Sequence, residues 1–253
     1  MSKKPSAPRE NPGYQPKATS SRSAYALIAA AVVVVALVIG GFVWNATRSY
    51  PPVDDAVLAQ NAAIIVGGTP TPANPIATVD IFEDAACPHC REMEAQSGHA
   101  LAAAAQAGQL RIRYHLLTFM DSSSPSGSYS SRAAGAILCV ARNGDDLQVF
   151  TRLHSDLFAQ APTSDSPSDL TNAQMAELAG RSGAGDATRQ CIVDGTLVGE
   201  AVERGKTSSV QLANSNDGNV ATPTVLVAGE QVSGILDGDA WVAQVIAEGA
   251  PAR

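Results

Sequence analysis

The sequence predicts an α/β domain that is preceded by one N-terminal transmembrane helix. Residues 24–44 form an apolar run without a charge, and residues 77–120 change from a strand pattern to helix formers and back to a strand pattern. A long helical stretch follows, and short strands with a closing helix return near residue 221. At 253 residues, the chain is long enough for one substantial domain with additional segments.

The apolar run, 21 residues long, reaches about the 20 residues that a helix needs to cross a bilayer. Residues 1–22 carry five Lys or Arg and one Glu, a net charge of +4. The basic side of a span stays in the cytoplasm, so we expect a single-pass protein of the cytoplasmic membrane with residues 45–253 outside. A cleaved signal peptide is the alternative, although its apolar region usually spans about 7–15 residues. The formal charge of −7 leaves −11 for the rest of the chain, which argues against a nucleic-acid partner.

The first half of the exported part predicts a strand–helix–strand unit. Residues 45–61 are expected to form a tether, and the short apolar run at 64–66 could add an edge strand. "ATVDIFED" at 77–84 alternates as a strand does, helix formers then continue to Gly108, and "LRIRYHLLTFM" at 110–120 is rich in β-branched and aromatic residues. Parallel strands need a crossover helix of this kind.

The second half is predicted to be mainly helical. A serine-rich loop at 121–131 precedes four expected helices, with a possible capping box at Thr171 and Gln174. The chain then forms a strand, a turn near Gly229, a second short strand and a helix from Asp239. The expected helices of the middle region are 132–143, 146–160, 172–182 and about 186–213.

The motif "CPHC" stands where the first strand gives way to the helix. Cys87 at the helix N-terminus faces unpaired N–H groups and the positive end of the helix dipole, which lower a thiol pKa. Pro88 suits the first helical position, and Cys90 lies one turn deeper on the same face, within disulfide reach. An imidazolium at His89 would stabilise the Cys87 thiolate and so favour the dithiol over the disulfide. These residues predict a redox pair that acts as an oxidant.

"CPHC" after a strand, with "ATPT" at 221–224 far downstream, resembles the DsbA-like branch of the thioredoxin-fold oxidoreductases. The resemblance spans residues 62–248 and implies a thioredoxin-like fold with an inserted α-helical domain. It makes Pro223 a cis-proline that faces the cysteines and Thr222 the residue whose backbone pairs with the substrate; from sequence alone a trans proline is expected. The implied division of the chain is a cytoplasmic disordered tail at 1–23, the anchor at 24–44, the tether at 45–61, thioredoxin-fold parts at 62–120 and 214–248, the helical insertion at 121–213, and a tail at 249–253.

The resemblance implies a membrane-anchored enzyme that introduces disulfide bonds into exported proteins. Its partners would be unfolded exported chains with cysteine pairs and a DsbB-like or VKOR-like membrane protein that reoxidises it. No cofactor is expected, because the cysteine pair carries the electrons. An extracytoplasmic reductase or isomerase is the alternative, and a non-enzymatic tethered binding module is the remote one.

One position departs from the pattern of many thioredoxin-fold proteins, which keep a buried acid six residues before the first cysteine. Ile81 stands there in this chain. Glu83 or Asp84 could accept a proton instead, or both could be solvated charges at the strand end.

The two remaining cysteines, Cys139 and Cys191, fall in different expected helices. Pairing within CPHC leaves them as a structural disulfide, or else as two free buried thiols; zinc is disfavoured because it prefers two close ligand pairs, so no metal is expected. His99, His115 and His154 are isolated in sequence and are expected to be surface or satisfied polar residues rather than ligands.

Overall fold

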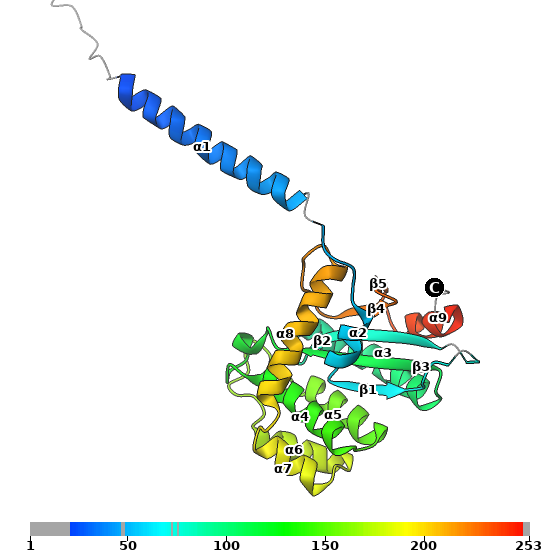
Figure 1. The fold of residues 1–253 in the computed structure, drawn as a ribbon. Coiled ribbons are helices and arrows are strands. Elements are labelled where there is room, and N and C mark those ends of the chain that lie inside the picture. Colours follow the sequence, from blue (N-terminus) through cyan, green and yellow to red (C-terminus); the bar gives the residue numbers. More distant parts are fainter. Residues whose placement is uncertain (1–20, 47–48, 72, 75, 250–253) are drawn as a thin grey trace, which may run out of the picture. The chain divides into compact units, whose positions relative to one another are not determined.

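The computed structural model of the chain describes residues 21–46, 49–71, 73–74 and 76–249 (Figure 1). It contains two units, Met1–Ser49 and Tyr50–Arg253. Helix α1 (Ser21–Ala46) belongs to the first unit, and its large apolar side chains between Tyr25 and Ile39 are exposed. Within the described ranges, no helix combines the length and the apolar character that crossing a membrane requires. Most of the predicted cytoplasmic tail, residues 1–20, lies outside the described residues.

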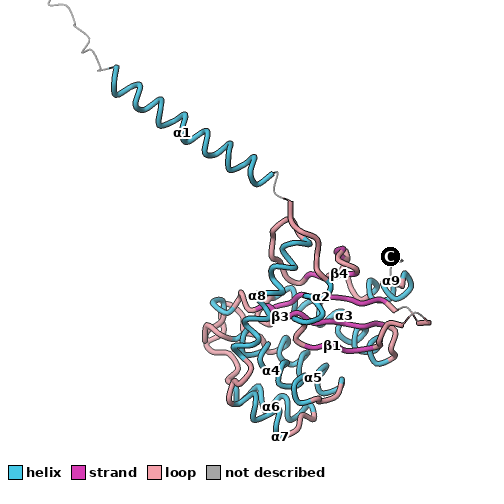
Figure 2. Tube along the Cα trace, viewed as in Figure 1, coloured by secondary structure: helices cyan, strands magenta, loops and turns pink. Residues whose placement is uncertain are grey.

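The second unit is built on a β-sheet (Figure 2). This sheet has five strands in the order β1-β3-β2-β4-β5. Strands β2 and β3 are parallel and are joined by α3 (Pro88–Gln106), which confirms the predicted strand–helix–strand unit; all other pairs are antiparallel. The short apolar run near residue 64 forms the edge strand β1. The strands are β1 (Ile64–Gly67), β2 (Ala77–Asp84), β3 (Leu110–Leu117), β4 (Thr224–Val227) and β5 (Glu230–Gln231).

The helices between β3 and β4 gather beside the sheet, as expected of a thioredoxin-like fold with a helical insertion (Figure 1). A short 3-10 turn, η1 (Asp121–Ser123), precedes them. The capping box predicted at Thr171 and Gln174 is present at the start of α6. The remaining helices are α2 (Asp55–Asn61), α4 (Tyr129–Asn143), α5 (Leu147–Ala159), α6 (Asn172–Ser182), α7 (Asp186–Val193), α8 (Val198–Ser215) and α9 (Ala240–Glu248).

Two helical predictions need correction. The predicted tether contains α2, because Asp54 accepts hydrogen bonds from the N–H groups of Ala56 and Val57 and so caps a helix that the proline-rich context conceals. The single helix expected at 186–213 is two helices. Gly195 in the turn between them has a φ of 63°, a left-handed conformation that an α-helix does not contain.

Strand β2 is buried on both faces, so its alternate side chains serve two different cores. Val79 and Ile81 belong to the larger core with apolar residues of α3, α4, α5 and α6. Phe82 belongs to the smaller core with Leu58 of α2 and Leu212 of α8. The strand that leads to the cysteines is therefore held from both sides.

A buried polar network joins α2 and α8 to the sheet on the side of the smaller core. Arg113 of β3 donates two hydrogen bonds to the carboxylate of Asp80, at 2.7 and 2.6 Å, and a third to Asp55 at 2.8 Å. His115 Nε2 lies 2.8 Å from the same Asp80, and its Nδ1 lies 3.1 Å from Ser208 Oγ of α8. Asp80, His115 and Ser208 are all 1% exposed or less, so this serine–histidine–aspartate arrangement cannot meet a substrate.

Candidate active site

Cys87 lies where β2 has ended and α3 begins. Its extended backbone, with φ −77° and ψ 122°, places it at the N-cap, and its N–H donates to the Asp84 carbonyl at 2.9 Å. Pro88 occupies the first helical turn, where its missing N–H costs no hydrogen bond. The Cys87 sulfur therefore stands at the positive end of the α3 dipole.

The two cysteines of the motif are free thiols with opposite properties. Cys87 and Cys90 are both buried, at 5% and 0% exposure. A hydrogen bond from the Cys90 thiol, with others from Thr222 and the backbone N–H groups of Cys90 and His89, outweighs burial and lowers the pKa of Cys87 to about 5. Burial and the neighbouring Cys87 raise the pKa of Cys90 far above its ordinary value. The thiolate at neutral pH therefore belongs to Cys87, which identifies it as the nucleophile.

The His89 ring does not stand where the sequence predicted. Its side chain is 67% exposed, and Nδ1 lies 3.4 Å from the Glu92 carboxylate, one turn along α3. The backbone N–H of His89, rather than an imidazolium, lowers the pKa of Cys87. The helix start itself provides the stabilising donors.

The loop before β4 completes the site from the far end of the sequence. The Thr222–Pro223 peptide bond is cis, and Cys87 Sγ donates to the Thr222 carbonyl at 3.3 Å. The Thr222 hydroxyl is buried, and no hydrogen-bond partner for it is found among the described residues; it can donate to the Cys87 sulfur once that sulfur is a thiolate. Antiparallel pairing of β4 with β2 brings these residues to the cysteines, since Thr224 lies opposite Phe82.

The two acids at the end of β2 are buried, so the interpretation as solvated charges is wrong for both. Asp84 accepts hydrogen bonds from the N–H groups of Ala86 and Met120 and from the Ser130 hydroxyl. Burial, partly offset by these donors, raises its pKa to about 6. Asp84 therefore holds together three segments around the cysteines: the β2–α3 turn, the end of β3 and the start of α4.

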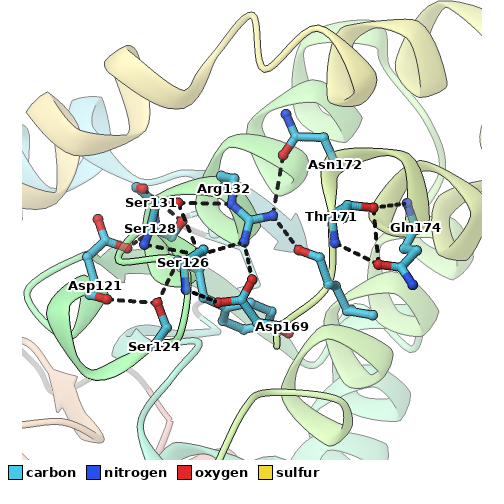
Figure 3. Close-up of polar contacts among 12 residues, drawn as sticks. Asp121, Ser124, Ser126, Ser128, Ser131, Arg132, Asp169, Thr171, Asn172 and Gln174 are labelled. Carbon is cyan, nitrogen blue, oxygen red and sulfur yellow. Dashed lines mark hydrogen bonds and ion pairs between the residues drawn. The ribbon is translucent and has the colours of Figure 1, made fainter. Parts of the chain in front are cut away.

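The serine-rich loop that precedes α4 is fixed by Arg132, as Figure 3 shows. Arg132 donates to Asp169 at 2.6 Å and to Ser126 at 3.0 Å, and it also contacts the Leu170 carbonyl. The Ser126 N–H donates to the same Asp169 at 3.0 Å. This network sets the first turn of α4, from which the Ser130 hydroxyl reaches Asp84.

Glu83 is the buried acid that keeps one carboxylate oxygen without a hydrogen-bond partner among the described residues. It is 0% exposed; one carboxylate oxygen, Oε1, lies 2.5 Å from His154 Nε2, and no hydrogen-bond partner for Oε2 is found within the described residues. Burial raises its pKa, and the negative charge of Cys87 raises it further, whereas His154 lowers it. Glu83 therefore binds a proton more readily than an exposed carboxyl group does, and its charge is coupled to that of Cys87.

The other sequence-predicted residues lie away from the cysteines. Cys139 of α4 and Cys191 of α7 form a disulfide within the helical insertion. His99 is exposed, while His115 and His154 are buried with polar partners. Sequence reasoning missed the partners of His154, although Glu94 follows Cys90 by four residues and so lies on the same face of α3.

A sheet of this topology, with two thiols at the head of α3 and a cis-proline loop beside them, defines a thiol–disulfide oxidoreductase of the thioredoxin fold. The sequence profile described as Thioredoxin matches residues 65–246, and the chain belongs to this family, in its DsbA-like form. Among solved structures, the fold is similar to the reduced disulfide bond oxidoreductase DsbG from Mycobacterium tuberculosis, with 27% identity, a TM-score of 0.57, and coverage of 76% of this chain and 96% of that one. DsbA from Mycobacterium tuberculosis is 26% identical with a TM-score of 0.57, over 74% of this chain and 98% of that one.

A second kind of relative is much longer than this chain. The serine/threonine-protein kinase PknE from Mycobacterium tuberculosis is 34% identical over 188 residues, which are 74% of this chain but 32% of that protein. The chain thus matches about a third of the length of these curated relatives. The fold is also shared with the thiol–disulfide oxidoreductase MdbA from Corynebacterium diphtheriae, at 22% identity and a TM-score of 0.63, over 80% of this chain and 98% of that one.

Proposed function

We propose that the chain is a membrane-anchored, extracytoplasmic oxidase that introduces disulfide bonds into exported proteins through the Cys87–Cys90 pair. The observation that carries this proposal is the stabilised thiolate of Cys87, with a pKa lowered to about 5 by donors at the head of α3 and by Thr222. Stabilising the thiolate favours the reduced pair, so the disulfide is a strong oxidant. A thiolate of low pKa is also a good leaving group.

The reaction proceeds in two exchanges. A client thiolate attacks Cys87 Sγ of the oxidised pair; the client–Cys87 bond forms as the Cys87–Cys90 bond breaks, and its electron pair stays on Cys90. A proton from Glu83 converts that Cys90 thiolate to the thiol, which burial favours. A second client thiolate then attacks the client sulfur of the mixed disulfide, and Cys87 leaves as a thiolate. The client loses two electrons, the pair gains them, and no cofactor takes part.

Clients are expected to be unfolded exported chains with cysteine pairs, held mainly through backbone contacts at Thr222. Phe119 and Val220 support this client class, because both are exposed apolar residues, at 51% and 40%. Phe119 precedes Met120, which is bonded to Asp84, and Val220 lies two residues before Thr222. An extended apolar chain would find contacts on both segments that flank Cys87.

The proposed location rests on the apolar run at 24–44 and on the basic residues before it. The run would anchor the chain in the cytoplasmic membrane with residues 45–253 outside, next to a DsbB-like or VKOR-like protein that takes two electrons from the pair. Deleting residues 1–44 should release the protein from the membrane fraction; equal amounts in the membrane fraction with and without them would contradict the anchor.

The decisive experiment is the reduction potential of the Cys87–Cys90 pair in the full chain. The chain, in mild detergent, is equilibrated with glutathione mixtures, trapped by alkylation and read by mass, with Cys87→Ser as the control. We expect a potential less negative than about −220 mV, the oxidising end of the range for the glutathione pool. A value near or below about −270 mV, that of thioredoxin, would instead indicate a reductase supplied with electrons across the membrane. A value between these limits would leave a useful fraction of the pair reduced and favour an isomerase, and a pair inert to thiols would favour a binding module.

A further inference from the structure

A buried cluster of two glutamates and one histidine lies behind the redox pair. His154 of α5 stands between the two acids, with Nε2 at 2.5 Å from Glu83 of β2 and Nδ1 at 3.3 Å from Glu94 of α3. The side chains of Glu83 and His154 are 0% and 2% exposed, and that of Glu94 is 10% exposed. The three elements that supply them are β2, which leads to Cys87, α3, which carries Cys90, and α5 of the helical insertion.

The surroundings of His154 are aromatic, and Tyr114 is a titratable group among them. The rings of Phe150, Phe158 and Tyr114 lie with their centroids 5.2, 4.6 and 5.1 Å from the imidazole. Burial and the charges of Glu94 and Glu83 raise the pKa of Tyr114 well above its usual value, so it stays neutral. Glu94 and His154 also line a surface pocket of about 230 Å³, together with His99 and the exposed Arg152.

The two glutamates of this cluster differ in the direction of their pKa shifts. Burial opposes a charge on His154, but attraction to Glu83 and Glu94 outweighs it and raises the pKa of His154 to about 10. Burial likewise opposes the charge of Glu94, but His154 outweighs it and the pKa of Glu94 is lowered. Glu94 is therefore the ionised partner of a histidinium, and Glu83 is the acid whose pKa remains raised.

We propose that His154 and Glu94 are positioning residues that hold Glu83 beside the redox pair and fix the pH at which Glu83 exchanges its proton with Cys90. The Nε2–H of His154 fastens Oε1 of Glu83, which leaves Oε2 free for the proton. During client oxidation, the proton moves from Glu83 to the Cys90 thiolate and leaves a Glu83 carboxylate. During reoxidation, the Cys87 thiolate attacks the partner's disulfide, and one partner sulfur leaves as a thiolate. Cys90 then gives its proton back to Glu83 as its sulfur attacks Cys87 Sγ of the mixed disulfide; the Cys87–Cys90 bond forms, the second partner sulfur leaves with the electron pair, and the cluster ends as it began. This proposal rests on the proposed function.

The positive charge of His154 and the negative charge of Glu94 act on Glu83 in opposite directions, which gives the test its sign. Without the charge of His154, Glu83 should keep its proton to a higher pH; without the charge of Glu94, it should lose its proton at a lower pH. Neighbouring charges at such distances shift a carboxyl pKa by about 1–3 units. A purely structural role predicts no such pair of opposite shifts.

The experiment measures how fast a small dithiol opens the Cys87–Cys90 disulfide in the oxidised full chain between pH 5 and 9. The rate constant is divided by the thiolate fraction of the dithiol, so that the remaining pH dependence reports the proton donor. In the unmodified chain the corrected rate should fall as pH rises through the pKa of Glu83. The midpoint of this fall should move up by about one pH unit or more in His154→Gln and move down in Glu94→Gln.

His99→Gln is the matched control, because His99 lines the same pocket but is exposed. Unfolding in urea establishes which variants are folded, and Glu94→Gln, with the more accessible side chain, carries the test alone if His154→Gln does not fold. Midpoints that stay at the unmodified value in the folded variants would overturn the role of His154 and Glu94 while leaving the oxidase proposal intact. An unmodified disulfide that no dithiol opens would overturn both proposals.

Discussion

The two faces of the sheet each bury a histidine among carboxylates, yet the two histidines carry different charges. On the face of α2 and α8, His115 contacts Asp80 at 2.8 Å, and its pKa is lowered by burial and by Arg113 against the pull of Asp80. On the face of α3 and α5, His154 contacts Glu83 and Glu94, and its pKa is raised to about 10. Burial is nearly complete in both places, so burial does not decide the charge.

The two clusters differ in whether a cation other than the histidine compensates the charge of the carboxylate. Arg113 binds Asp80 through two hydrogen bonds and compensates its charge, so a proton on His115 would add an uncompensated charge. Glu83 and Glu94, by contrast, form their ion pairs among the described residues with His154 itself, so the proton on His154 supplies the compensating charge. The first arrangement is structural, whereas the second keeps a carboxyl group with a raised pKa near the thiols.

Removing Arg113 should give the largest change in stability, because Asp80 and His115 would then lack a second cation, as Glu83 and His154 do among the described residues. In Arg113→Met, Asp80 loses its compensating charge, so His115 should become protonated at neutral pH, and unfolding should cost about 3–5 kcal/mol less than in the unmodified chain. Urea unfolding gives the free energy, and ¹⁵N spectra of the imidazole give its protonation. The exposed partner of Arg113 provides the control: Asp55, at 60% side-chain exposure, should cost at most about 1 kcal/mol in Asp55→Asn. Equal losses in the two variants, or a neutral His115 in Arg113→Met, would contradict this account of the difference.

The local part of this structure could be predicted from the sequence, because its signals lie within single segments. Strand alternation at 77–84, the helix formers after Cys90 and Pro88 at the helix start all report on neighbouring residues. The position of Cys87 at the head of α3 follows from them. The Thr222–Pro223 loop entered through a family resemblance, because nothing local in "ATPT" relates it to a motif more than 100 residues earlier.

The charged clusters could not be predicted in this way, since each joins three or more elements through long-range packing. The sequence allowed Glu83 to be a solvated charge at the strand end, but His154 of α5 contacts and buries it. The sequence predicted that His89 stabilises the thiolate, but its ring lies beside Glu92 on α3. Helix α2 was hidden by the proline-rich context of the tether, although Asp54 is a standard capping residue. A histidine on an apolar helix face, as at Phe150, His154 and Phe158, is the sequence signal that would have pointed to a buried acid.

Stability should depend on pH with opposite slopes for the two histidines. The folded-state pKa of His154 is raised from 6.5 to about 10, so its ionisation stabilises the fold fully below about pH 6.5, and this contribution is lost as pH rises towards 10. The folded-state pKa of His115 is lowered, so the unfolded chain binds more protons and stability is lost as pH falls below about 6.5. The difference in unfolding free energy between the unmodified chain and His154→Gln should therefore shrink from pH 6.5 to 10. The difference from His115→Gln should shrink from about pH 7 to 5.

Urea titrations of the unmodified chain and the two variants, at one-unit pH steps, test these slopes. Taking differences removes the contribution of groups that all three proteins share, such as Asp84. If both differences in unfolding free energy shrank above pH 6.5, or both shrank below it, the two histidines would have the same charge in the folded state. The proposed contrast between the clusters would then be wrong.

The smallest expected effect concerns the serine that accompanies each cluster. Because Nε2–H of a neutral His115 donates to Asp80, its Nδ1 is an acceptor and the Ser208 hydroxyl donates to it at 3.1 Å. Ser208 is 1% exposed, so no water replaces its hydroxyl in Ser208→Ala, and we expect a loss of about 1 kcal/mol with a rise in the pKa of His115. Ser155 donates to Glu94 from an exposed position, where water takes its place, so Ser155→Ala should leave the unfolding free energy unchanged. Equal losses of unfolding free energy in the two variants would contradict this prediction, because they would show that burial of the hydrogen bond does not determine how much it stabilises the fold.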